Sequence, residues 1–325
     1  MVLPRLLRGL CVRVLPGGVH AEGAEDAEHE REKKRLGEKL IKPLPSRRAQ
    51  RDPPPGIKYP AIVFYYAGNY VLCSASSHEG EHMIMKRILF AGDSITKGEL
   101  GCGYLPLIAQ QFPSFELVNL GRDGDTVFGI MNRTISHLRK DSRYDLIVIA
   151  AGHNDIILSD FMEKSKVHVS IVKNLKKKGS IAASDYNEFV STYTELIRSV
   201  RDILPSPIIL TTLSCLNEDL LAPTNEKRSL YNQGIRKIAS EHNLRLADIA
   251  EEFDSVLKES TCRDYFMNSL FTSLLFDQWK SKTQAGADKL SKKRSLNLTI
   301  DGIHLNSRGA EIYAKLLTAG FDMDE

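Results

Sequence analysis

The chain has 325 residues, of which 42% are apolar and 26% charged, and its net charge is +3. These proportions are typical of a globular protein and exclude a chain that is disordered or fibrous throughout. The charge is too balanced to predict a nucleic-acid partner, and no apolar run reaches the roughly 20 residues needed to cross a bilayer. At about 100–200 residues per domain, the length allows one large domain or two ordinary ones.

The cysteines are scattered along the chain. They are Cys11, Cys73, Cys102, Cys215 and Cys262, an odd number without a CxxC or His-paired spacing. This pattern argues against a disulfide framework and against a zinc site, and it fits a reducing compartment.

The composition changes sharply near residue 84. Met1–Ala21 is basic and free of acids, and the residues after it are first densely charged and then rich in proline, which favours an extended chain. We expect residues 1–84 to be a flexible or poorly structured N-terminal extension. Within it, Ala61–Cys73 could form a strand or a small hairpin, but it has no evident partner there. No signal peptide separates Met85 from the first motif, which predicts a cytoplasmic protein, with organellar targeting by residues 1–21 as the alternative.

From residue 85 onward, apolar runs of strand length alternate with amphipathic segments. The expected strands are Lys86–Ser94, Phe115–Gly121, Tyr144–Gly152, Ser206–Leu213 and Leu244–Ala250. The expected helices are Tyr104–Phe112, Thr126–Lys140, Asp185–Leu204, Glu226–Asn243 and Ser307–Phe321. Such alternation forms βαβ units around a parallel sheet, so we predict one α/β domain over residues 85–325.

Two basic stretches, Ser159–Ser184 and Thr272–Leu298, do not fit this alternation. The simplest interpretation is a solvated loop or an exposed helix face. The alternative is a lid, or a site for an anionic partner whose phosphates the lysines would hold.

A candidate nucleophile follows the first expected strand, in the tripeptide Gly92, Asp93, Ser94. Ligands of open α/β sheets bind at the carboxyl ends of the strands. A serine at this turn is exposed, and its amide lies near a helix N-terminus, which favours developing negative charge. Thr96 stands where the G-x-S-x-G turn of α/β-hydrolases has its second glycine, so that class is disfavoured.

A base for this serine is suggested by Asp301 and His304, which are three residues apart. On one turn of chain the carboxylate could fix the tautomer of the imidazole and stabilise its charged form. Taken alone, the same spacing is also that of a capped turn before the last helix.

Acyl transfer further needs hydrogen-bond donors for an oxyanion. The loop Gly121–Thr126 follows the second expected strand and could turn a backbone N–H toward Ser94. Asn154 follows the third expected strand, and its side-chain amide is a natural second donor. Each loop alone is ordinary turn chemistry, and the G-x-G-x-x-G spacing of a dinucleotide site is absent.

Four ordered segments resemble the SGNH hydrolases, also called the GDSL esterase/lipase family: FAGDSIT, LVNLGRDGDT, IAAGHND and TIDGIHLNSRG. The resemblance spans about residues 86–320. It implies a three-layer α/β/α sandwich with a central five-stranded parallel sheet, similar to flavodoxin. It implies Ser94 as nucleophile and His304 as base, oriented by Asp301. The oxyanion donors would be Ser94, Gly124 and Asn154, and no metal or organic cofactor is implied.

Some residues near these segments depart from the family pattern or add to it. The first block reads GDSIT where many members have GDSL or GDSxS. His153 could compete as a base, but no acid is spaced to orient it, so we expect it to line the pocket. Asp93 and Asp155 are expected to make turn hydrogen bonds without a catalytic role.

The sequence therefore predicts a serine esterase that hydrolyses carboxylic esters through an acyl-enzyme. A short acyl chain is expected, because nothing in the sequence marks a long apolar tunnel. The substrate would be a small-molecule, carbohydrate or lipid ester, with no nucleic acid as partner. One alternative is an acyltransferase on the same site. The other is a non-catalytic binding module that uses the basic stretches Lys164–Lys178 and Lys280–Arg294.

Overall fold

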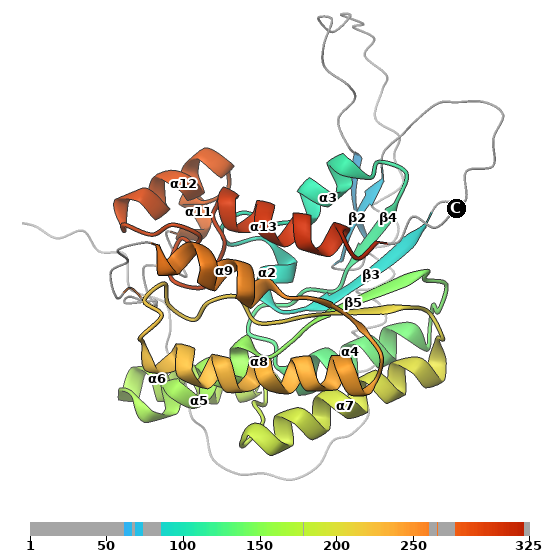
Figure 1. Cartoon of the computed structure of the whole chain (residues 1–325), viewed down its shortest axis with the longest axis horizontal. Coiled ribbons are helices and arrows are strands. Elements are labelled where there is room, and N and C mark those ends of the chain that lie inside the picture. The colour runs from blue at the N-terminus through green and yellow to red at the C-terminus, as the bar shows by residue number, and fades with distance from the viewer. Residues whose placement is uncertain are drawn as a thin grey trace, which may run out of the picture. The chain divides into compact units, whose positions relative to one another are not determined.

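In the computed structural model, five neighbouring parallel strands make up most of one sheet (Figure 1). They are β3 (Arg87–Gly92), β4 (Glu116–Asn119), β5 (Leu146–Ala150), β6 (Ile208–Thr211) and β7 (Arg245–Ala247). Their order is β4-β3-β5-β6-β7, and all neighbours pair in parallel. Every residue of β5 is buried, which explains its uninterrupted apolar sequence. The predicted five-stranded parallel sheet is confirmed.

The structure describes residues 62–66, 69–73, 86–177, 179–259, 265 and 277–321, all of which fall in the unit Lys58–Glu325. Residues 1–61, which include the candidate targeting stretch, lie outside this part of the chain. The expected compartment and the flexibility of most of the N-terminal extension therefore stay predictions.

A hairpin extends the sheet at the β4 edge. Its strands β1 (Ile62–Tyr66) and β2 (Asn69–Cys73) are antiparallel to each other, and β2 also pairs antiparallel with β4 through Val71 and Leu72. The sequence indicated the hairpin but not its partner, because the partner is an edge strand of the following domain. The backbone N–H and C=O groups on that edge of β4 pair with β2. The sheet therefore begins before residue 84, where the domain boundary was expected.

Helices cover both faces of the sheet, which confirms the three-layer α/β/α architecture (Figure 1). One face carries α3 (Leu105–Gln111), α9 (Ile249–Lys258) and α13 (Ser307–Thr318). The other carries α4 (Val127–Leu138), α7 (Tyr186–Ile203) and α8 (Pro223–Glu241). Within the described part of the chain, no helix is both long and apolar enough to span a membrane.

Helix α7 shows how the sequence pattern produces this packing. Its side chains Phe189, Tyr193, Leu196, Ile197 and Val200 recur at helical spacing and are fully buried. Its N-cap, Asp185, accepts a hydrogen bond from the backbone N–H of Glu188. The cap supplies an acceptor for one of the free N–H groups of the first turn, and the apolar stripe provides the packing energy that a marginal isolated helix lacks.

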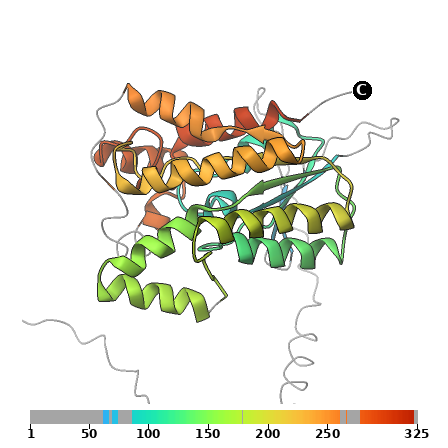
Figure 2. The same ribbon diagram turned by 60° about the horizontal axis from the view of Figure 1, so that its bottom comes forward.

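The two basic stretches contain helices at the carboxyl-terminal end of the sheet. Ser159–Ser184 holds the end of α5 (His153–Glu163) and all of α6 (Lys166–Lys177). The other stretch holds α11 (Gln278–Lys280) and α12 (Gln284–Lys293). Helices α5 and α6 lie side by side in a corner beyond the α4 and α7 layer (Figure 2). No residue of α6 is buried, which confirms the expected exposed helix face.

Candidate active site

Ser94 lies at the carboxyl end of β3, as the first residue of the short helix α2 (Ser94–Lys97). The N-cap Asp93 accepts a hydrogen bond from the backbone N–H of Ile95 at 2.9 Å, which is the expected turn contact. The loop after β4 crosses directly over this helix at Gly121. A Cβ on that residue would overlap the backbone of Lys97, so only glycine permits the approach.

His304 and Asp301 reach Ser94 from the loop before α13. Nε2 of His304 lies 3.0 Å from Oγ of Ser94, and Nδ1 lies 2.7 Å from Oδ2 of Asp301. The other carboxylate oxygen of Asp301 accepts the backbone N–H groups of Ile303 and His304, at 3.0 and 2.8 Å. Ser94 and His304 are 210 residues apart in sequence, and the fold brings them into contact.

Burial and charge act in opposite directions on these two groups. Burial by itself disfavours the charged form of both side chains. The charge and hydrogen bonds of His304 outweigh it at Asp301, so the pKa of that carboxyl is lowered. The charge and hydrogen bond of Asp301 outweigh it at His304, so the pKa of the imidazole is raised. His304 is therefore protonated more readily in this site than a free histidine side chain is in water.

Two further predicted residues border the same pocket as Ser94. Gly124 has a left-handed backbone, with φ of 68°, in the loop after β4. Asn154 lies at the start of α5, where its Nδ2 donates to the carbonyl oxygen of Asp125 at 2.9 Å. That hydrogen bond fixes the side-chain amide beside the loop that carries Gly124. Ser94, Gly124, Asn154 and His304 thus line one pocket, and Asp301 contacts the side of His304 that faces away from Ser94.

A model of the GDSL-like lipase/acylhydrolase family matches residues 90–312, which is most of the part that carries these contacts. The chain belongs to this family. It is a carboxylic ester hydrolase, as the sequence predicted, and the resemblance to the SGNH hydrolases is confirmed. A sequence search of curated proteins finds no match.

Solved structures are similar to this GDSL-type hydrolase at low identity. A catalytic mutant of Axe2, an acetylxylan esterase from Geobacillus stearothermophilus, is 19% identical with a TM-score of 0.50, over 73% of this chain and 95% of that one. The acetyl xylan esterase AlAXEase is 18% identical with a TM-score of 0.49, over 72% and 99%. At such identity the likeness to Axe2 supports the fold.

His153 lines the pocket as expected, but an acid does contact it. Its Nδ1 lies 3.2 Å from Oδ2 of Asp93, and its Nε2 lies 3.2 Å from Oγ of Ser214. The expectation that no acid is placed to orient it was therefore wrong, because Asp93 is distant in sequence and near only in the fold. Both ring nitrogens of His153 have partners other than Ser94.

Asp155 is also not the local turn residue that the sequence predicted. It is fully buried and accepts the backbone N–H groups of Val127 and Ala183, each at 3.0 Å. These groups belong to the start of α4 and to the segment after α6, so the contacts are long-range and not those of a local turn. Burial raises the pKa of this carboxyl to about 7 despite both hydrogen bonds.

The pocket has a volume of about 370 Å³ and a largely apolar wall. Helix α5 contributes Ile157, Leu158 and Phe161, and helix α6 contributes Ile171 and Leu175. The sequence did not assign these side chains to the site. A signal was present in the spacing of Ile171 and Leu175, one helical turn apart within a basic stretch.

A buried carboxylate anchors the segment that leads into Asp301. Oε1 of Glu218 accepts the backbone N–H groups of Leu298 and Thr299 and the hydroxyl of Thr299, at 2.7–2.8 Å. The backbone N–H of Asn217 donates to the carbonyl of Gly302 at 2.9 Å. Sequence reasoning missed both residues, because an acid in a loop after a strand carries no sign of its distant partner.

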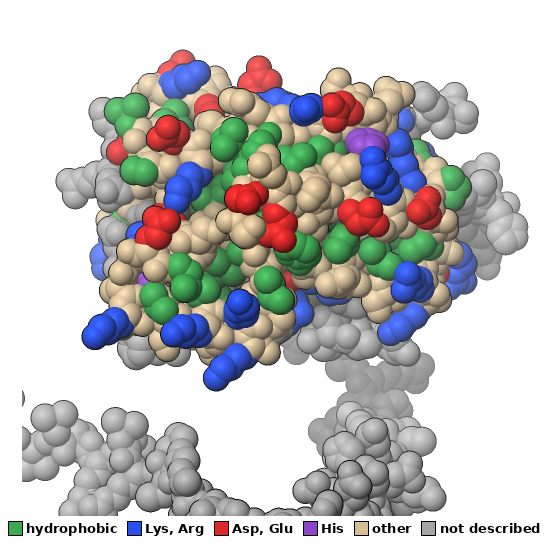
Figure 3. Space-filling model, turned by 90° about the horizontal axis from the view of Figure 1, so that it is seen from below, with side chains coloured by type: hydrophobic (Ala, Val, Ile, Leu, Met, Phe, Trp, Pro, Cys, Tyr) green, Lys and Arg blue, Asp and Glu red, His purple; other side chains and the backbone are tan. Residues whose placement is uncertain are grey.

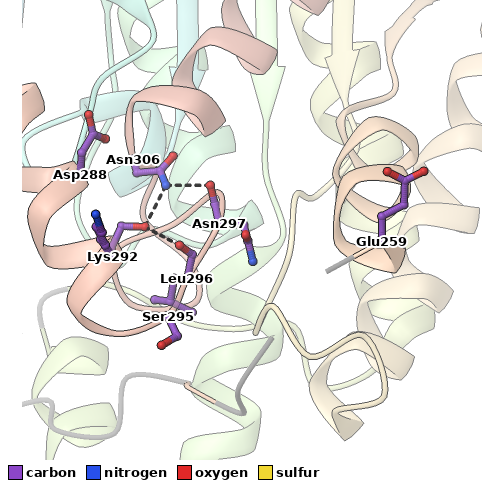
Figure 4. Close-up of a pocket in the computed structure, with 8 residues that line it drawn as sticks. Glu259, Asp288, Lys292, Ser295, Leu296, Asn297 and Asn306 are labelled. Carbon is purple, nitrogen blue, oxygen red and sulfur yellow. Dashed lines mark hydrogen bonds between the residues drawn. The ribbon is translucent and has the colours of Figure 1, made fainter. Parts of the chain in front are cut away.

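A second pocket, of about 600 Å³, lies between the end of α9 and α12 (Figure 4). Asn306 donates there to Ser291 and to the carbonyl of Asn297, both at 2.9 Å, while Glu259 stands apart, directly after the end of α9. None of the predicted site residues lines this pocket. In the described part of the chain, no cluster of three or more His, Cys, Asp or Glu could hold a metal ion.

Proposed function

We propose that Ser94, His304 and Asp301 are the catalytic triad of this hydrolase and that its substrates are esters with short acyl groups. The observation that carries the proposal is the placement of the imidazole between the other two side chains, at 3.0 Å from Ser94 and 2.7 Å from Asp301. With Nδ1–H donating to Asp301, Nε2 is the free base that faces the hydroxyl.

The reaction would proceed in two halves. Oγ of Ser94 attacks the ester carbonyl carbon while its proton passes to Nε2 of His304. The imidazolium then returns that proton to the leaving alcohol as the ester C–O bond breaks, which leaves an acyl-serine. A water molecule repeats the sequence with His304 as base, and the acid is released. Asp301 stabilises the imidazolium in both halves without being protonated.

Three donors would bind the oxyanion of each tetrahedral intermediate. They are the backbone N–H groups of Ser94 and Gly124 and the side-chain amide of Asn154. Support comes from their shared pocket and from the amide of Asn154, which gives one N–H to Asp125 and keeps a second for a ligand. Pre-aimed donors of this kind contribute about 2.7–4 kcal/mol each to the lowering of the barrier.

The pocket dimensions support a short acyl group. Ligand pockets span about 300–1,000 Å³, and this one, at about 370 Å³, lies at the small end of that range. It must also admit the part of the alcohol next to the ester bond. The apolar side chains of α5 and α6, Phe161 and Leu175 among them, would contact the acyl chain.

The triad is tested by initial rates on p-nitrophenyl acetate for the full chain and for Ser94→Ala. We expect the rate to fall by about 10³-fold or more in the variant, with unchanged circular dichroism. Activity that survives in Ser94→Ala would show that another group is the nucleophile. Product analysis with an added alcohol acceptor separates hydrolysis from acyl transfer, because a transferase would yield the ester of the acceptor.

The acyl pocket is tested by the same rates on acetyl, butyryl, octanoyl and dodecanoyl esters. The wild-type chain should prefer the two shorter ones. Leu175→Ala should raise the rate on octanoyl relative to acetyl ester, by about fourfold for each methylene newly accommodated. Val172→Ala is the matched control, because Val172 lies on the same helix but does not line the pocket. If the wild type and both variants show the same preference for acyl-chain length, the acyl chain does not contact Leu175.

A further inference from the structure

Arg133 lies on α4, and its guanidinium points toward the sheet. Charged side chains of both signs are spread over the outer surface on the side of α4 and α7 (Figure 3). Arg133 instead donates inward, from Nε to the carbonyl of Leu120 at 2.8 Å and from Nη2 to the carbonyl of Gly92 at 2.9 Å. Leu120 follows β4, and Gly92 ends β3 just before Asp93 and Ser94. One side chain thus holds the carboxyl ends of two neighbouring strands, one of which leads directly to Ser94.

The third nitrogen of the guanidinium, Nη1, forms an ion pair with Oδ2 of Asp125. Asp125 is only 1% exposed, and a buried carboxylate needs an opposite charge to offset its lost hydration. Within the described part of the chain, Arg133 is the one cation that reaches this carboxylate, which accepts no other hydrogen bond. The position of Asp125 is therefore tied to that of Arg133.

Asp125 joins two of the proposed oxyanion donors. It directly follows Gly124 in the chain, and its carbonyl oxygen accepts a hydrogen bond from Nδ2 of Asn154 at 2.9 Å. A displacement of Asp125 would therefore move the amide of Gly124 and the side-chain amide of Asn154 together. The ion pair with Arg133 fixes both donors at one point.

Helix α4 leaves room for the carboxylate of Asp125 at Gly129. This glycine lies one turn before Arg133 on the same face of the helix. A Cβ there would overlap Oδ1 of Asp125. Since alanine is the better residue in a helix interior, the helix itself does not call for the glycine. Its place is explained by the carboxylate that packs against it.

We propose that Arg133 is a positioning residue for the oxyanion site: it fixes Gly92 and Asp125, and through them all three donors, before a substrate binds. This inference rests on the proposed function of those donors. Donors held in advance need no rearrangement as charge develops on the carbonyl oxygen, and a displacement of about 1 Å costs about 10²-fold in rate. Arg133 is not among the residues that line the pocket, so it acts through the two loops and not by contact with the substrate.

The test compares Arg133→Met with Arg236→Met, each in the full chain, on p-nitrophenyl acetate. Arg236 is the matched control because it also joins a helix, α8, to the loop after a strand, through both carboxylate oxygens of Asp248 at 2.7 and 2.9 Å. That loop carries none of the predicted site residues. We expect kcat to fall by about 10–100-fold in Arg133→Met, with KM within about threefold, and to stay unchanged in Arg236→Met. Unfolding in urea verifies that the rates are those of folded chains.

A second readout separates positioning from a general loss of structure. Oγ of Ser94 can add to the boron of butylboronic acid while its proton passes to His304, and the tetrahedral adduct carries an oxygen at the oxyanion site. Affinity for this compound should fall in Arg133→Met by the same 10–100-fold, about as much as kcat. A variant that is merely less folded would lose rate, but its folded molecules would keep the affinity of the wild type.

Gly129→Ala disturbs the ion pair without removing the guanidinium. If Arg133 served stability alone, this change to a better helix former should leave kcat as it is. A positioning role predicts a loss of kcat comparable to that in Arg133→Met. Arg133→Lys keeps the charge but lacks the fork that holds two carbonyls and a carboxylate, so it should recover only a small part of kcat. These two variants carry the test if Arg133→Met does not fold, and wild-type kcat in any of the three overturns the proposal.

Failure of the proposed function would give a different result. A wild-type chain that binds no butylboronic acid, or a Ser94→Ala variant that keeps its rate, would contradict the proposed triad. If the wild type binds the compound and Ser94→Ala is inactive, but Arg133→Met keeps both kcat and affinity, only the role of Arg133 is contradicted.

Discussion

The carboxylate of Asp301 holds His304 at two points. One oxygen contacts ring Nδ1 at 2.7 Å, and the other accepts the backbone N–H of the same residue at 2.8 Å. The ring and its main chain are thus fixed by a single acid, three residues earlier in the chain. A β-bridge between Thr299 and Leu305 closes the loop around this pair. Orientation of the base is therefore a local property of the loop, whereas its distance to Ser94 is set by the whole fold.

The variant Asp301→Asn should keep the backbone contact and change only the contact with the ring. The amide oxygen can still accept the backbone N–H groups of Ile303 and His304, so the loop should keep its conformation. The amide NH₂ would face Nδ1 and force the proton onto Nε2, the wrong tautomer for a base. We expect kcat on p-nitrophenyl acetate to fall by about 10²–10⁴-fold, with unfolding in urea nearly unchanged. A decrease in kcat of less than tenfold would contradict the role of Asp301.

The pH dependence of kcat/KM should follow His304. The reaction needs the neutral imidazole, and the charge of Asp301 raises its pKa above the ordinary value of 6.5. Activity should therefore rise with pH along an acid limb whose midpoint lies above 6.5. Asp301→Asn removes the negative charge and should move the midpoint to lower pH. His153→Gln should leave it in place; a shift in that variant alone would make His153 the base.

Gly124→Ala tests the loop that carries the proposed oxyanion amide. With φ of 68°, an alanine there is strained by about 1–2 kcal/mol, and its Cβ would lie 3.3 Å from the side chain of Leu175. A small displacement of the amide should lower kcat by about 10–100-fold. Gly179→Ala is the control, because its φ is 92° and nothing lies within 4 Å of the added Cβ. It should lose similar stability but keep kcat. Equal activity of both variants would remove Gly124 from the oxyanion site.

The parts of the site that could be predicted from sequence are those that follow strands. Ser94, Gly124 and Asn154 each come after a parallel strand, and the carboxyl ends of such strands meet at one edge of the sheet. His304 was indicated by its neighbour Asp301. The contacts that could not be predicted are the long-range ones, in which the two partners share no local pattern. The pairing of β2 with β4, the contact of Asp93 with His153 and the anchoring by Glu218 are of this kind.

Asp155 is the strongest case of such a long-range contact, because it joins the start of α4 to the segment after α6. Asp155→Ala would leave the buried N–H groups of Val127 and Ala183 without an acceptor. At about 1–3 kcal/mol for each, we expect a loss of about 2–6 kcal/mol in the free energy of unfolding, measured in urea. Glu163→Ala on the same helix is the control. Its side chain is exposed, so the cost should stay below about 1 kcal/mol.

The loss in Asp155→Ala should also depend on pH. Burial raises the pKa of Asp155 from 3.8 to about 7, so in this interval the folded chain binds more protons than the unfolded chain. The stability contributed by this carboxyl is then greatest at acid pH and falls as the pH rises through about 7. The wild type should exceed the alanine variant by more at the acid end of that interval than above it. A difference that grows with pH would mean that the carboxylate is held charged by its two hydrogen bonds.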